Sequence, residues 1–136
     1  MKWLSHSVED TYEVASEIAK KIGPSDTICL FGDLGAGKTT FVKGLVKSFG
    51  VAPEQVSSPT FVYLNIYQGP VSFYHFDLYR LKDEAAFLSM GFDEYLDQEG
   101  IKCIEWSEKI ALILPSNVIK ITLTHVNEGT RQIEKS

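Results

Sequence analysis

The sequence predicts an α/β protein, a three-layer sandwich built on a mainly parallel central sheet with antiparallel additions. Two observations carry this prediction. Short β-branched and apolar runs alternate with helical segments along the chain. One such run, TICLF, leads directly into a glycine-rich turn that opens onto a helix, which is a unit typical of parallel sheets. The 136 residues, 44% hydrophobic and 23% charged, predict a single domain over residues 1–136.

Each element has its own signal in the sequence. Ser7 followed by Asp10 resembles a capping box, and Gly23-Pro24 stops the helix that follows. Gly69-Pro70 separates two strand-like runs and predicts a hairpin. The last run, residues 130–135, is expected to be an edge strand. In order, the sequence predicts a helix at 7–22, a strand at 27–31, a helix at 38–49, strands at 61–68 and 71–79, helices at 83–90 and 92–98, a strand at 101–106, a short helix at 107–114, and strands at 117–126 and 130–135.

Residues 32–39, GDLGAGKT, match the phosphate-loop pattern G-x4-G-K-[ST] in full. Glycines let backbone N–H groups turn towards phosphates, and the helix that follows presents its positive N-terminal end to the same anion. Lys38 supplies a point charge, and the Thr39 hydroxyl suits a magnesium ion. This motif predicts the fold type of phosphate-loop NTPases. The expected nucleotide contacts are Asp33, Leu34, Gly35, Ala36, Gly37, Lys38, Thr39 and Thr40.

Two acids follow strand-like runs and suit the magnesium ion and the attacking water. Asp77 follows VSFYHF, and Glu105 follows IKCI. Both are expected in the crevice at the carboxyl ends of the strands. We assign Glu105, with Thr39, mainly to the metal and Asp77 to positioning water or ordering His75 and Arg80, although the two roles can be exchanged.

Further residues are candidates for the same site. Thr60, in SSPTF, is placed to sense a terminal phosphate as switch loops do, although a simple turn before a strand explains it equally well. Lys38, Asp77, Glu105 and Thr60 are therefore the predicted catalytic set. Trp106 is either a core residue or an aromatic beside the nucleotide or a partner.

Composition limits the partners. A net charge of −5 and a pI near 5.1 argue against RNA binding through the overall field of the chain, so a partner is expected to hold any nucleic acid. No membrane span or secretory signal is apparent, and cytoplasmic residence is expected. Cys29 and Cys103 lie in apolar runs without metal-site spacing, which favours buried free thiols. The chain lacks the N-K-x-D pattern of guanine-specific switch proteins, which favours ATP over GTP.

Five blocks in this order and spacing, GDLGAGKTTF, SSPTF, HFDLYRL, LSMGFDEYL and IEWSE, resemble the TsaE family, also called YjeE, over residues 5 to 130. The phosphate loop is shared by many families, whereas the SPT, H-x-D-L-Y-R and E-W blocks are specific. The resemblance implies a slow ATPase that binds ATP and Mg²⁺ and supports TsaD and TsaB. These partners form threonylcarbamoyladenosine next to the anticodon of tRNAs reading codons that begin with A. The tRNA would be met only through them.

Residue by residue, the resemblance assigns Lys38 and Thr39 to the phosphate loop, Thr60 to the SPT block and Asp77 to H-x-D. Glu105-Trp106 matches the E-W pair. It also implies that the region around Glu9 and that around Gly129 flank the adenine.

Two other functions compete with a regulatory ATPase. A small-molecule kinase needs an acceptor pocket and usually an arginine-bearing lid, and no insertion of that size is visible. A binding module with a vestigial loop is disfavoured because Lys38, Thr39, Asp77 and Glu105 are intact.

Overall fold

The computed structural model of the chain describes residues 1–33 and 35–136. The helices are α1 (Val8–Ala19), α2 (Lys38–Ser48), α3 (Glu84–Ser89) and α4 (Asp93–Leu96), with 3₁₀ turns η1 (Pro53–Gln55) and η2 (Ser107–Ile113). The strands are β1 (Lys2–Ser5), β2 (Thr27–Phe31), β3 (Leu64–Tyr67), β4 (Phe73–Asp77), β5 (Ile101–Glu105), β6 (Ile119–Asn127) and β7 (Thr130–Lys135). The predicted alternation of strands and helices is therefore present.

All the described strands join one sheet in the order β1-β7-β6-β2-β5-β4-β3. The four central strands, β6, β2, β5 and β4, run parallel to their neighbours. The outer pairs β1–β7, β7–β6 and β4–β3 are antiparallel. This is the mixed sheet that the sequence predicted, with the parallel strands in the middle.

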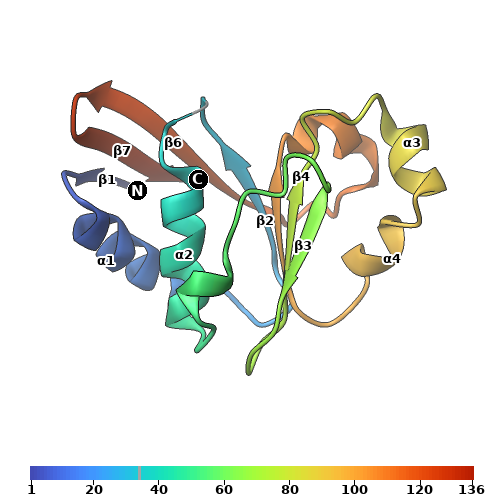
Figure 1. Cartoon of the computed structure of the whole chain (residues 1–136), viewed down its shortest axis with the longest axis horizontal. Coiled ribbons are helices and arrows are strands. Elements are labelled where there is room, and N and C mark those ends of the chain that lie inside the picture. Colours follow the sequence, from blue (N-terminus) through green and yellow to red (C-terminus); the bar gives the residue numbers. More distant parts are fainter. Residues whose placement is uncertain (34) are drawn as a thin grey trace.

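Helices cover both faces of this sheet, so the three-layer arrangement is confirmed. Figure 1 shows α1 and α2 on one side of the sheet and α3 and α4 on the other. The α1/α2 layer packs on a core that includes Phe41, Leu45 and Ile28. The second layer packs on Phe76 and Ile104 through Phe87 of α3 and its neighbours. Adjacent residues of β4 and β5 point to opposite faces, and each face has its own core.

The prediction that residues 130–135 form an edge strand is wrong. They form β7, which lies between β6 and β1 and pairs with both. The edge belongs to β1, a strand of four residues that no sequence pattern indicated. Its pairing with β7 joins the two ends of the chain, because Trp3 faces Ile133 across the ladder.

Two predicted boundaries also shift. Residues 61–63 are not part of β3, because Val62 and Tyr63 donate to the Pro59 carbonyl in a turn and Tyr63 has a φ of 67°. The first helix ends at Ala19, ahead of Gly23-Pro24, and the residues between continue as turns that bury Ile22. At its start the Ser7 hydroxyl accepts from the Asp10 amide, as the capping signal predicted.

The fold gathers three loops at the carboxyl ends of the parallel strands. The glycine-rich turn follows β2, Asp77 ends β4, and Glu105 ends β5. Asp77 and Glu105 are partners across the β4–β5 ladder.

Both thiols, Cys29 and Cys103, are buried and free. No helix among the described residues has the length and apolar content needed to cross a bilayer.

Helix α1 packs closely on α2, and the missing side chain at Gly44 allows this approach. A Cβ atom at Gly44 would lie 3.0 Å from the Ala15 Cβ and from the Tyr12 Cα. We expect Gly44→Val to lower the free energy of unfolding by about 1–3 kcal/mol, the usual cost of overpacking. Gly23→Ala is the matched control, since its Cβ would meet only Asp26 at 3.6 Å. Urea denaturation checks this, and equal midpoints for the two variants would contradict it.

Candidate functional site

The glycine-rich turn is shaped as an anion cradle at the start of α2. Gly37 is the N-cap residue of α2 with a φ of 95°, and helical residues begin at Lys38. Gly35 also has a positive φ, and a Cβ there would meet nothing within 4 Å. Backbone N–H groups at such a turn and the positive end of the helix both favour a bound anion. The predicted contact Leu34 lies outside the described residues.

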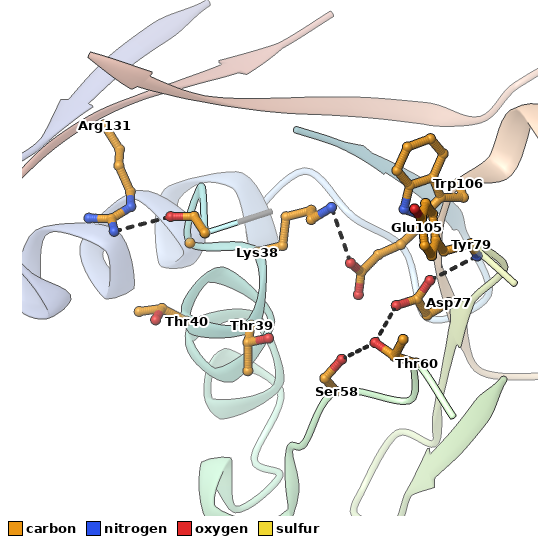
Figure 2. Close-up of a pocket in the computed structure, with 12 residues that line it drawn as sticks. Lys38, Thr39, Thr40, Ser58, Thr60, Asp77, Tyr79, Glu105, Trp106 and Arg131 are labelled. Carbon is orange, nitrogen blue, oxygen red and sulfur yellow. Dashed lines mark hydrogen bonds and ion pairs between the residues drawn. The ribbon is translucent and has the colours of Figure 1, made fainter. Parts of the chain in front are cut away.

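The Lys38 ammonium lies between the loop and the sheet. Its Nζ donates to the Gly32 carbonyl at 2.7 Å and lies 3.5 Å from the Glu105 Oε1. Both side chains are largely buried, at 11% and 7% exposure. This ion pair joins the phosphate loop to the end of β5 (Figure 2).

The Glu105 carboxylate has a second buried partner. The His75 Nε2 lies 2.7 Å from the Glu105 Oε2, and His75 is fully buried on β4. Burial alone raises the pKa of Glu105, but the hydrogen bond from His75 and the charge of Lys38 hold it below its ordinary value. The acid is therefore ionised at neutral pH.

Asp77 has different contacts from those expected. Its Oδ2 accepts from the Thr60 hydroxyl at 2.8 Å, and its Oδ1 accepts from the Tyr79 amide at 3.0 Å. The His75 imidazole is bonded to Glu105, its diagonal neighbour, and not to Asp77, so for His75 the two acids have the exchanged roles that the sequence left open. The predicted partner Arg80 lies with its guanidinium 4.3 Å from the centre of the Phe61 ring.

These groups line one cavity of about 560 Å³ (Figure 2). The structure brings together Gly35, Gly37, Lys38, Thr39, Thr40, Thr60, Asp77 and Glu105 from the predicted set, with Ser58, Tyr79, Trp106 and Arg131 beside them. Asp33 lines a smaller cavity of about 280 Å³ that also touches Lys38 and Trp106. Ala36 is buried at 1% exposure. Four loops from distant parts of the sequence thus meet around one space.

A comparison of the sequence with known protein families identifies the family of this chain. The family model "Threonylcarbamoyl adenosine biosynthesis protein TsaE" matches residues 5–133. The chain belongs to the TsaE family. The resemblance stated from the sequence blocks is therefore confirmed over nearly the whole chain.

Individual TsaE relatives cover most of the chain as well. The TsaE protein of Treponema pallidum is 36% identical over 98% of both chains. That of Bacillus subtilis is 37% identical over 98% of this chain and 83% of its own. The crystal structure of Bacillus subtilis YdiB superposes with a TM-score of 0.76 at 31% identity, covering 98% of this chain and 82% of that one.

Of the two regions expected to flank an adenine, the one around Gly129 reaches the cavity of about 560 Å³ only through Arg131. Neither Glu9 nor Gly129 is among its residues. The chain segments next to these two residues are in contact, because the His6 Nδ1 lies 3.1 Å from the Thr130 hydroxyl. Their role in this TsaE protein stays a prediction.

Trp106 lies at the cavity and not in the core. It is 36% exposed, has a φ of 60°, and packs against Tyr79 with ring centres 5.0 Å apart. The Lys38 Nζ lies 5.9 Å from its ring centre. A large aromatic side chain therefore lines the cavity beside Lys38, which rules out the core alternative, while its contact with a nucleotide or a partner stays a prediction.

Arg131 is a site residue that the sequence did not indicate. Its Nη2 donates to the Gly35 carbonyl at 3.4 Å, and its buried Nε has no hydrogen-bond partner among the described residues. It reaches the loop because β7 lies beside β6 and not at the sheet edge. No local motif marks it, since only the strand order brings residue 131 to residue 35.

The donor set fits a nucleotide-bound magnesium ion better than a site made by protein alone. Among the described residues, no three His, Cys, Asp or Glu side chains cluster as a metal site. Mg²⁺ usually takes one or two protein oxygens and completes its shell with phosphates and waters. Thr39, Glu105 and Asp77 on one cavity wall supply such a partial set.

A side chain at Gly37 would have to displace the Arg131 side chain. A Cβ atom there would lie 2.9 Å from the Cδ and Nε of Arg131. We expect Gly37→Ala to cost about 1 kcal/mol more of unfolding free energy than Gly91→Ala, because both place alanine at a positive φ but only the first meets another residue.

The excess should vanish in an Arg131→Ala background, as measured by a double-mutant cycle in urea. An unchanged excess would mean that Arg131 does not fill the space over the loop.

Proposed function

We propose that this TsaE protein binds ATP with Mg²⁺, hydrolyses it slowly, and thereby regulates partners that form threonylcarbamoyladenosine in tRNA. The observation that carries the proposal is the convergence of Lys38, Glu105 and the Asp77–Thr60 pair on one cavity at the start of α2. The names of the family and of its relatives assign them to threonylcarbamoyladenosine biosynthesis.

Each residue has a proposed role. The backbone of the phosphate loop and Lys38 hold the phosphates, and Thr39 with Glu105 holds the metal. Asp77 positions the attacking water, with Thr60 as the residue that responds to the terminal phosphate. When bound, the metal supplies charge neutralisation on the phosphates. Arg131, whose Nε has no partner among the described residues, is placed beside the loop to contact the nucleotide.

The partners are expected to be the TsaD and TsaB homologues of the cytoplasm, with tRNA bound by them. The net charge of −5 supports an indirect role at the tRNA. Coupling of this kind is reciprocal: if ATP changes partner affinity, the partner changes ATP affinity by the same factor.

Variants at Lys38 and Glu105 test the site. We expect Glu105→Gln to lower Mg²⁺-dependent ATP turnover by about 10²-fold while nucleotide affinity changes little, because the acid acts on metal and water. Lys38→Ala should weaken ATP binding itself. Calorimetric titration and phosphate release measure the two effects.

Two exposed residues at the end of α1 provide charge-matched controls. Glu17→Gln is the control for Glu105→Gln, and Lys20→Ala is the control for Lys38→Ala. Equal losses of binding and turnover in Glu105→Gln would assign that residue a structural role.

The regulatory role has its own test. ATP turnover is measured with the chain alone and with purified TsaD–TsaB. We expect the partners to change the turnover rate and Lys38→Ala to remove that change. Absence of both binding and any rate change would refute the regulatory role. Transfer of labelled phosphate to a metabolite faster than to water would favour a small-molecule kinase.

A further inference from the structure

A chain of buried polar groups runs from the phosphate site into the apolar core. From Glu105 it passes to His75 at 2.7 Å, and from the His75 Nδ1 to the Tyr67 hydroxyl at 2.8 Å. His75 is 0% exposed and Tyr67 is 2% exposed. Burying polar groups costs free energy unless every one is hydrogen-bonded, so this chain needs each of its links.

The period of the strands places all of these groups on one face of the sheet. Tyr67 faces Phe73 across the β3–β4 ladder, and His75 faces Cys103 across the β4–β5 ladder. Alternate residues share a face, so Glu105 lies on the side of His75. This is the side covered by α2, where the phosphate loop begins.

At its far end the chain reaches the loop of residues 57–60. The Tyr67 hydroxyl donates to the Ser57 carbonyl at 2.9 Å, and the Ser57 amide donates to the Tyr67 hydroxyl oxygen at 3.4 Å. The Asn65 side-chain amide also donates to the Ser57 carbonyl and hydroxyl, at 3.2 and 3.1 Å. The other end of this loop is Thr60, which donates to Asp77. The loop is thus tied to the phosphate site at both ends.

The Tyr67 hydroxyl has one proton for two acceptors. It donates either to the Ser57 carbonyl or to the His75 Nδ1. When it donates to His75, the neutral imidazole carries its own proton on Nε2 and donates that to Glu105, while Asn65 still serves Ser57. Burial raises the pKa of Tyr67, so its hydroxyl keeps the proton in either arrangement. When Tyr67 donates to the Ser57 carbonyl instead, a neutral imidazole must place its proton on Nδ1, and its Nε2 then has none to donate to Glu105. The hydrogen bonds at Ser57 and at Glu105 therefore depend on each other.

We propose that Tyr67 and His75 are positioning residues that couple the Glu105 carboxylate to the loop of residues 57–60. Phosphate that engages Lys38 alters the partners of Glu105, and the Tyr67–His75 link transmits that change to Ser57. The link also holds Glu105 in a productive orientation. This inference rests on the proposed ATP site and adds the path by which nucleotide reaches the loop.

The test compares two removals of a single phenolic hydroxyl. Tyr67→Phe cuts the link, whereas Tyr74→Phe removes a hydroxyl that bonds Gln98 on the opposite face of the sheet. We expect Tyr67→Phe to lower kcat for ATP about fivefold to tenfold, the loss of about one buried hydrogen bond, with KM nearly unchanged. Tyr74→Phe should keep wild-type kcat.

A second readout follows the loop directly. Hydrogen exchange is measured on the peptide spanning residues 57–63, with and without Mg²⁺ and a non-hydrolysable ATP analogue. Val62 and Tyr63 donate to the Pro59 carbonyl there, so their amides report on the loop. We expect the analogue to change exchange in Tyr67→Phe less than in wild type and Tyr74→Phe, because only the contact between Thr60 and Asp77 then joins the loop to the site. His75→Gln, whose amide can reach Glu105 but not Tyr67, should show the same reduced response.

The outcomes separate the two claims. A wild-type chain that does not bind the analogue overturns the proposed ATP site and this inference with it. A wild-type chain that binds, with Tyr67→Phe and Tyr74→Phe alike in kcat and in exchange, overturns the coupling alone. A loop response in His75→Gln as large as in wild type would also overturn it.

Discussion

The rest of the site depends on a single constraint, the burial of the ionised Glu105 carboxylate. This residue ends a central strand and is 5% exposed. An ionised group in the interior is costly unless it is paired and fully hydrogen-bonded. Its two partners come from different elements, His75 from β4 and Lys38 from α2. The strand order β2-β5-β4 and the position of α2 on the same face are therefore needed to keep this one charge in place.

The same pairing sets the chemistry of the phosphate loop. Lys38 is shared between the Gly32 carbonyl and Glu105. A phosphate bound in the cradle, as proposed, would compete with Glu105 for the Lys38 ammonium and so alter the charge balance at the end of β5. His75 would then carry more of the interaction with the acid. Because His75 is itself bonded to Tyr67, this change would extend from the loop surface into the core.

Local patterns in the sequence predicted most of the elements and the phosphate loop, because each has a short-range signal. The four-residue strand β1 has none, and its only support is pairing with β7 at the other end of the chain. The same long-range pairing places Arg131 over the loop. The partners of the two acids were also out of reach, because Asp77 is two residues from His75 in sequence while the ladder brings Glu105 to it. Contacts that depend on strand order and register cannot be predicted from the sequence of any single segment.

The two acids, although partners across the ladder, are not equivalent. Asp77 is held by neutral donors, the Thr60 hydroxyl and the Tyr79 amide, so its charge is not offset by an adjacent cation. Glu105 lies against the Lys38 ammonium and the His75 Nε2, so it has both an ion pair and a hydrogen bond. If a metal ion binds as proposed, Asp77 and Glu105 would both be near enough to hold it, but Glu105 would first have to share or lose its ion pair with Lys38.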